Sequence, residues 1–327
     1  MASLVELRVL EGPNLYFPRA AIKLTLDITA LSHASEGTAS RFAARIGLAN
    51  ARPGAPDSGF RQRFALRAVS RLVRAVAGES GTARLAVRVR STSDPHQIVV
   101  AYPWVHRERA QVMGRAVADV LDAMPSSDMD EAVSAAALRV SAAEPGARPQ
   151  TLTPKVPVVA VTGTNGKTTT SRMIAHIART DGRVVGWSNT DGIYIDGELV
   201  EAGDYSGPSG AGQVLADKRV DFAVTETARG GILLKGIGLT ANDVSVVTNV
   251  SADHLGLQGI DTLDQLAEVK GVVPHITRKD GWAVLNGDDR GSTPCTRPSR
   301  PSRGCSPAIP THPRSVRCCP LVAGPRR

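Results

Sequence analysis

Cysteine is missing from the first 294 residues of this 327-residue chain. All four cysteines, Cys295, Cys305, Cys318 and Cys319, lie near the carboxyl terminus. None of them has C-x-x-C spacing or stands near a pair of histidines, which are the usual ligand patterns of zinc. We therefore predict no zinc site from the cysteines.

Long apolar runs are also missing. No run reaches the roughly 18 residues that cross a bilayer, and Glu6 and Arg8 interrupt the first twenty residues, unlike the pattern of a signal peptide. Hydrophobic residues nonetheless make up 42% of the chain, which at this length is enough for the cores of about two domains. We predict a cytoplasmic protein without a membrane partner.

Acidic residues, lysine and aromatic residues are absent after Asp289. That segment, residues 290–327, carries eight prolines and eight arginines. Residues 1–289 hold equal numbers of basic and acidic residues, so the net charge of +8 belongs to the tail. Because the tail has no periodic apolar pattern, we predict that it is a disordered basic tail. Only this tail favours a nucleic-acid partner, and we expect none.

Periodicity predicts an amino-terminal α/β domain over residues 1–143. Residues 4–10 and 97–102 have the pattern of strands, and apolar residues at helical spacing predict a helix within residues 65–77. Four prolines then mark residues 144–157 as a linker.

Residues 158–289 predict a second α/β domain, of P-loop type, with a mostly parallel sheet and helices on both faces. Five candidate strands alternate with helix-forming segments. They are residues 158–162, 183–187, 221–225, 243–249 and 282–286. Nearly continuous apolar strands are typical of a parallel sheet that is covered on both faces. Ligands of such sheets bind beyond the carboxyl ends of the strands, so the residues that follow each strand are candidates for a site.

The first of these strands leads into a glycine-rich turn. It contains Gly163, Thr164, Asn165, Gly166, Lys167, Thr168 and Thr169. The glycines permit backbone angles that point successive N–H groups at an anion, Lys167 adds a mobile positive charge, and Thr168 offers a hydroxyl to Mg²⁺. The full Walker A pattern has a further glycine where this chain has Val161. The order of strand, turn and helix therefore favours a nucleotide-phosphate site over the alternative, a plain turn between a strand and a helix.

Polar residues follow two other candidate strands. Glu226 follows one of them, Asn249 ends the next, and Asp253 and His254 come after it. A carboxylate at a strand tip suits Mg²⁺, which prefers oxygen ligands and keeps waters and phosphate oxygens as its other ligands. Taken singly, Glu226 is also explained as a helix cap and His254 as a core histidine. Because these residues and the glycine-rich turn lie at the same edge of the predicted sheet, we favour the interpretation that they form one site.

These segments resemble the central domain of the Mur ligase family. The resemblance rests on residues 163–168, 226–231, 249–255 and 284–289. Residues 190–197 and 226–232 are most similar to the Mur-like half of cyanophycin synthetases. Residues 1–125 also resemble the amino-terminal domain of those synthetases, through Glu11-Gly-Pro-Asn14. The ATP-grasp domain that lies between these parts in a cyanophycin synthetase is absent.

The resemblance implies an ATP-dependent ligase. It would join a small-molecule or peptide carboxylate to the amine of an amino acid through an acyl phosphate, mostly by positioning and charge stabilisation. ATP would bind to residues 163–169, Asn249 and Asn286. One Mg²⁺ would be held by Thr168 and Glu226, and His254 would help to bind a second. The residues implied in catalysis are Lys167, His254 and Lys270.

Lys270 falls close to the position at which many Mur ligases carry a carbamylated lysine. Addition of CO₂ turns that cation into an anion able to lie beside Mg²⁺. An ordinary surface lysine on a helix is the alternative.

On the substrate side, polar residues in loop-rich segments are candidate contacts. They are Thr190, Asp191, Asp204, Ser206 and Arg229. Simple turn chemistry is an alternative explanation of such residues.

The resemblance stops at Asp289, before the third, Rossmann-like domain with which Mur ligases bind the amine and close the site. We expect residues 290–327 to result from a shift of reading frame, with a natural basic extension as the alternative. The chain would then bind ATP and Mg²⁺ with little or no turnover. Two other functions stay open: a folylpolyglutamate synthase-like ligase, and a nucleotide-binding module or non-catalytic remnant.

Overall fold

The computed structural model describes residues 3–124, 129–253, 255–289, 292 and 316–320. Contacts divide the chain into two compact units, residues 1–10 with 20–149 and residues 11–19 with 150–327. No helix in the described part of the chain is long and apolar enough to cross a membrane.

The short segment Glu11–Arg19, which sequence similarity groups with the amino-terminal domain, belongs to the second unit. The Glu11 amide donates to the carbonyl of Lys235 at 2.8 Å, and the Pro13 carbonyl accepts from the Ile237 amide at 2.7 Å. A Cβ on Gly12 would lie 2.0 Å from the Ile237 carbonyl oxygen, so this close approach needs glycine.

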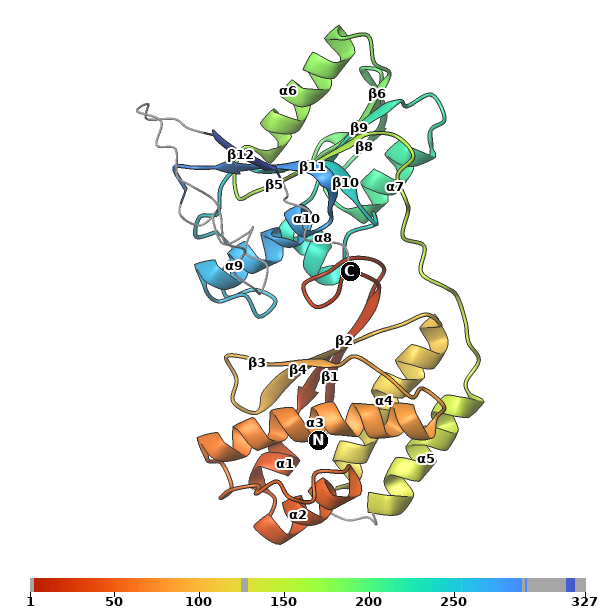
Figure 1. Ribbon diagram of the computed structural model, residues 1–327, viewed down its shortest axis with the longest axis vertical. Coiled ribbons are helices and arrows are strands. Elements are labelled where there is room, and N and C mark those ends of the chain that lie inside the picture. Colours follow the sequence, from red (N-terminus) through yellow and green to blue (C-terminus); the bar gives the residue numbers. More distant parts are fainter. Residues whose placement is uncertain (1–2, 125–128, 254, 290–291, 293–315, 321–327) are drawn as a thin grey trace. The chain divides into compact units, whose positions relative to one another are not determined.

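The first unit is a four-stranded antiparallel sheet covered by helices. Its strand order is β1 (Leu4–Leu10), β2 (Ala21–Asp27), β4 (Gln97–Pro103) and β3 (Arg88–Ser91). The helices are α1 (Thr29–His33), α2 (Glu36–Arg45), α3 (Gly59–Glu79), α4 (Arg107–Ala123) and α5 (Met129–Ala142). Both α3 and α4 pack against the sheet (Figure 1). The predicted strands 4–10 and 97–102 and the helix within 65–77 are confirmed.

The second unit is built on an eight-stranded sheet. Its order is β12 (Val316–Pro320), β11 (Thr277–Asn286), β10 (Asn242–Val247), β5 (Val158–Thr162), β9 (Phe222–Glu226), β6 (Val185–Ser188), β7 (Gly192–Ile195) and β8 (Glu198–Ala202). The five strands from β11 to β6 are parallel, and they are the five that the sequence predicts. Strands β7, β8 and β12 are antiparallel additions at the two edges.

Helices cover both faces of this sheet, which confirms the predicted fold class. On one face α6 (Lys167–Thr180) packs over Val159 and Val161. On the other face Val158 and Ala160 belong to the core under α7 (Pro208–Ala216), α8 (Arg229–Leu234), α9 (Leu263–Lys270) and α10 (Val272–His275). Alternate residues of β5 therefore serve two cores, as expected for a strand buried on both sides.

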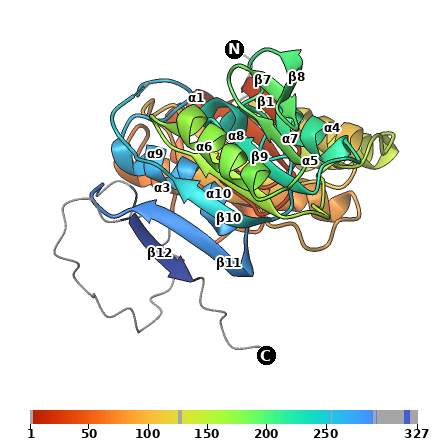
Figure 2. The same ribbon diagram turned by 90° about the horizontal axis from the view of Figure 1, so that it is seen from above.

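Strand β12 lies in the segment that we expected to be disordered. It pairs antiparallel with β11, and Figure 2 shows the two side by side at the edge of the sheet. These five residues form a strand although we expected a disordered segment. The physical reason is that an unpaired strand edge, here that of β11, offers backbone groups to any nearby extended chain. Apart from Ser292, the other residues of 290–327 lie outside the described part of the chain.

The strand order also determines where a ligand can bind. From β5 the chain passes to β6 on one side, whereas from β10 it passes to β11 on the other side. The loops after β5 and β10 therefore separate at a switch point, which is the usual ligand site of an open parallel sheet. Both loops carry residues that the sequence predicts for the site.

Candidate functional site

The glycine-rich turn leaves the end of β5 and leads into α6. Gly163 has φ +151° and Gly166, which precedes the first residue of α6, has φ +82°. A Cβ on Gly163 would lie 1.9 Å from Thr248 Oγ1, so only glycine fits there without displacing the loop after β10. No side chain caps the first turn of α6, which leaves its N–H groups available to an anion.

The loop after β10 holds this turn in place. The Asn165 amide donates to Asn249 Oδ1 at 3.0 Å, and Asn249 Nδ2 donates back to the Asn165 carbonyl at 3.1 Å. The Thr164 amide donates to the Asn249 carbonyl at 2.9 Å, and Thr248 Oγ1 donates to the Asn165 carbonyl at 2.6 Å. Asn249, predicted as an ATP ligand, thus bonds through its amide to the backbone of the turn and fixes its shape.

Lys167 folds back over the turn that precedes it. Its Nζ donates to the Thr164 carbonyl at 2.9 Å, and the side chain is only partly exposed. Asn165, Gly166 and Thr169 are exposed. The positive charge is therefore held next to the free N–H groups, and all of these donors are accessible to a phosphate.

Glu226, the last residue of β9, lies directly beside the start of α6. Its Oε2 accepts from Thr168 Oγ1 at 2.9 Å, and the same hydroxyl lies 3.1 Å from Thr190 Oγ1. The residue is 1% exposed, and its Oε1 is buried without a hydrogen-bond partner among the residues that the structure describes. Burial raises the pKa of Glu226, the hydroxyl of Thr168 and the charge of Lys167 act to lower it, and the net direction is upward.

Further buried polar atoms near the carboxyl ends of β6 and β9 lack partners among the described residues. They are Ser188 Oγ, Asn189 Nδ2 and Thr225 Oγ1. Asp204 and Asp191 also raise the pKa of Glu226, which places it in a negative field. An unpaired carboxylate oxygen beside a threonine hydroxyl is a fitting donor set for Mg²⁺, since a divalent cation would supply the missing partner. His254, which we predicted to help to bind a second Mg²⁺, lies outside the described residues.

A cavity of about 300 Å³ lies on the other side of the turn. It is lined by Gly163, Thr164, Lys167, Ala228, Arg229, Gly230, Asp253, Leu266 and Lys270. The structure thus brings Lys167, Arg229 and Lys270 to one cavity, although they are far apart in sequence. Lys270 is 3% exposed, so the alternative of an ordinary surface lysine is wrong. Asp253, one of the polar residues that come after the candidate strand 243–249, lines the same cavity.

Asn286 lies in a different place. It lines a groove of about 640 Å³ on the α6 face of the sheet, together with Thr170, Ile174, Val246 and Asp288 among others. Asn286 Oδ1 accepts from the Asp288 amide at 3.1 Å. The groove is mainly apolar, and Thr170 connects it to the first turn of α6.

Comparison with known proteins agrees with this geometry. Residues 161–299 match the family model of the Mur ligase middle domain. This part of the chain is therefore similar to the middle domain of Mur ligases. A cyanophycin synthetase from Crocosphaera subtropica is 57% identical over 135 residues, which are 41% of this chain and 16% of the synthetase. The match to the middle domain is therefore strong, but the chain spans about one sixth of the curated synthetases that it matches.

More distant relatives share the middle domain as well. A UDP-N-acetylmuramoyl-L-alanyl-D-glutamate–2,6-diaminopimelate ligase from Geobacillus thermodenitrificans is 31% identical over 147 residues, or 42% of this chain and 30% of that ligase. A solved structure of a ligase with this name has a TM-score of 0.37 and 28% identity, with 42% of this chain and 28% of that chain covered. The sequence match thus extends beyond cyanophycin synthetases.

The candidate substrate residues of the middle domain occupy three environments. Thr190 contacts Thr168, and Arg229 lines the Lys167 cavity. Asp191 pairs with Arg172 at 2.6 Å. Asp204 Oδ1 accepts from the amide and the hydroxyl of Ser206, at 3.0 and 2.6 Å, which is the turn chemistry given as the alternative for this pair.

Proposed function

We propose that this chain binds ATP and Mg²⁺ and serves an amide-forming ligase reaction between a carboxylate and an amine. One observation carries the proposal. Glu226 is a buried carboxylate with one oxygen that has no partner in the described part of the chain, and its other oxygen bonds to Thr168 at the start of α6. Such an arrangement costs stability in the free protein, and a nucleotide-bound divalent cation would offset that cost.

The phosphates of ATP would lie in the turn of residues 163–169. Its N–H groups and the dipole of α6 favour negative charge, and Lys167 is placed to move from the Thr164 carbonyl to a phosphate oxygen. Thr168 and Glu226 would hold the Mg²⁺, which neutralises charge on the phosphates as the reaction proceeds. The adenine base would fit the apolar groove beside α6, where Asn286 supplies both a donor and an acceptor.

The carboxylate substrate would bind in the cavity next to Lys167. Arg229 is suited to a carboxylate, and Lys270 and Asp253 line the same space. A carboxylate oxygen would attack the γ-phosphorus, and the bond from that phosphorus to the bridging oxygen would break to release ADP. The amine would then add to the acyl phosphate, lose a proton and expel phosphate. In this scheme the residues bind, orient and stabilise charge, and none forms a covalent bond.

Two observations support a ligase of the cyanophycin synthetase type over a folylpolyglutamate synthase-like ligase or a nucleotide-binding module. The relatives at 54–57% identity are named cyanophycin synthetases. A cavity lined by two lysines, one arginine and one aspartate adjoins the phosphate turn, and a nucleotide sensor has no need of a second polar cavity.

Phosphate release tests the proposal. The protein is incubated with ATP and Mg²⁺ and with mixtures of amino acids and acidic peptides, and phosphate and ADP are measured. We expect ATP binding that requires Mg²⁺, and any release of phosphate, which should be slow, only when a carboxylate and an amine are both present. Loss of binding in Glu226→Gln but not in Glu198→Gln, whose side chain is exposed, would support the site. Binding without release under any mixture would favour a module or remnant, and no Mg²⁺-dependent binding would refute the proposal.

A further inference from the structure

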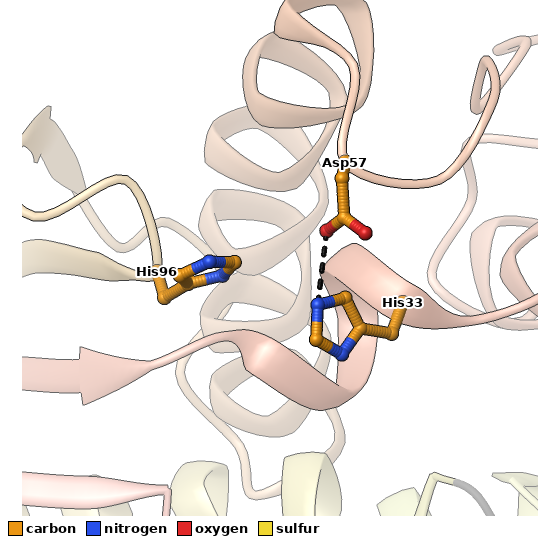
Figure 3. A group of neighbouring side chains, drawn as sticks. All are labelled: His33, Asp57 and His96. Atoms are coloured by element: carbon orange, nitrogen blue, oxygen red, sulfur yellow. Dashed lines mark ion pairs between the residues drawn. The ribbon is translucent and has the colours of Figure 1, made fainter.

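Two histidines and one aspartate converge on the surface of the first unit, away from the sequence motifs. They are His33, Asp57 and His96, and Figure 3 shows them turned toward one another. One potential ligand atom from each lies within 4.8 Å of those from the other two. His33 Nε2 is 3.1 Å from Asp57 Oδ1, and the rings of His33 and His96 meet edge to face with centroids 5.5 Å apart.

The backbone fixes all three residues relative to α1. His33 is the last residue of this helix. The Asp57 amide donates to the Ser32 carbonyl at 3.2 Å, and the His96 carbonyl accepts from the Ile28 amide at 2.8 Å. The three side chains thus come from three segments that are tied together by main-chain bonds.

Arg61 adds a second and stronger tie. Its side chain is fully buried, and its guanidinium donates to the carbonyls of Leu31 and Ala34, both at 2.8 Å. The same group donates to the carbonyls of Pro53 at 3.1 Å and Gly54 at 2.7 Å. A buried cation is tolerated when its donors are satisfied in this way. It clamps the end of α1, which carries His33, to the loop that leads to Asp57.

We propose that His33, Asp57 and His96 bind a divalent transition-metal ion of the zinc type. Two imidazoles and a carboxylate form a set that suits Zn²⁺ and its neighbours, whereas Mg²⁺ and Ca²⁺ prefer oxygen ligands only. Three protein ligands leave a fourth position for water or a ligand from outside. The site is thus chemically distinct from the magnesium site expected at Glu226.

The environment of each ligand fits this role. His33 and Asp57 are about half exposed, with side-chain exposures of 55% and 52%, so an ion can enter from solvent. His96 Nδ1 is buried without a hydrogen-bond partner, so the ring contributes one nitrogen that nothing among the described residues satisfies. Asp57 has φ +56°, a costly angle for a non-glycine residue, and this angle sets its carboxylate beside His33.

The test is a titration of the full chain with Zn²⁺. Because the four cysteines near the carboxyl terminus can bind zinc themselves, they are first alkylated. Binding is measured by calorimetry, and the thermal unfolding of the same samples is followed. We expect one equivalent of Zn²⁺ to be lost, or bound more than about tenfold more weakly, in His33→Gln, Asp57→Asn and His96→Gln. His176→Gln serves as the matched control, since His176 is an exposed histidine of the other unit.

The outcomes separate a metal site from a surface ion pair. Zn²⁺ should raise the unfolding temperature of the wild type and of His176→Gln, and the three ligand variants should lose this rise while unfolding normally without metal. Wild-type stoichiometry and affinity in all three ligand variants would overturn the proposal. If one variant fails to fold, the other two still decide the question. Tight binding of Mg²⁺ in place of Zn²⁺ at these residues would also contradict it.

Discussion

Glu226→Gln should stabilise the free protein at neutral pH. In the folded state the carboxylate is 1% exposed and Oε1 has no partner, so burial raises its pKa above the ordinary 4.5. An acid with a raised folded pKa destabilises the fold once it is ionised. This penalty is absent below the unfolded pKa, grows as the pH rises through the folded pKa, and is complete above it. Glutamine keeps an oxygen for Thr168 and removes the charge.

The size of the effect follows from the contacts. The amide nitrogen of glutamine is also left without a partner, so the gain comes only from removing the charge, whose burial costs about 1–3 kcal/mol more than that of a neutral group; the hydroxyl of Thr168 remains bonded in both proteins. We therefore expect a gain of about 1–3 kcal/mol at pH 7. For a unit of 150–250 residues this corresponds to a rise of roughly 2–4 °C per kcal/mol in the unfolding temperature.

Thermal unfolding of the wild type, Glu226→Gln and the exposed control Glu198→Gln at pH 7 and pH 4 measures this gain. The difference between wild type and Glu226→Gln should vanish at pH 4, and Mg²⁺ with ATP should stabilise the wild type but not the variant. A lower unfolding temperature for Glu226→Gln at pH 7, or a gain that persists at pH 4, would refute the reasoning.

Three further predictions concern the turn, the first unit and the polar cavity. Gly163→Ala places a methyl group 1.9 Å from a threonine hydroxyl, whereas Gly166→Ala meets nothing closer than 4.0 Å. In urea unfolding, the free energy of unfolding should fall by about 3 kcal/mol in Gly163→Ala and by about 1–2 kcal/mol in Gly166→Ala, and ATP titration should show the same order. Equal losses in the two variants would contradict the steric argument. Arg61→Met leaves buried carbonyls without donors and should cost at least about 3 kcal/mol in urea unfolding, unlike the exposed Arg63→Met. Lys270 is buried beside the phosphate turn and should take up CO₂. Incubation with ¹³C-bicarbonate should give a carbamate resonance in the wild type that is missing in Lys270→Met. Absence of this resonance from both proteins would contradict carbamylation.

The parallel strands of the second unit could be predicted because each contains a short apolar run, which in β11 covers only residues 282–285. The hairpin of β7 and β8 was missed, since every residue of β8 is exposed and the strand has no apolar face. A signal was nevertheless present: Asp196-Gly197 between two short strands is a typical two-residue hairpin turn, and both residues have positive φ.

The site could be predicted only in part. Thr168 and Glu226 follow two strand ends, so their meeting follows from the order of a parallel sheet. The burial of Lys270 depends on how α9 packs under the sheet, and a local pattern does not contain that information. Asn249 is a second example. The sequence places it near the end of a strand, but only the hydrogen bonds reveal that its side chain shapes the turn.

The segment Glu11–Arg19 has a practical consequence for dividing this protein. It is covalently part of the amino-terminal half, yet its backbone bonds to Lys235 and Ile237 in the second unit. A protease cut in residues 144–157 would therefore not yield two independent fragments, because one would keep a peptide that is built into the other. Likewise, a clone that starts at residue 150 would encode a second unit that lacks these backbone partners of Lys235 and Ile237. Fragments intended to fold separately should carry residues 11–19 with the second unit, grafted by a linker to its amino terminus.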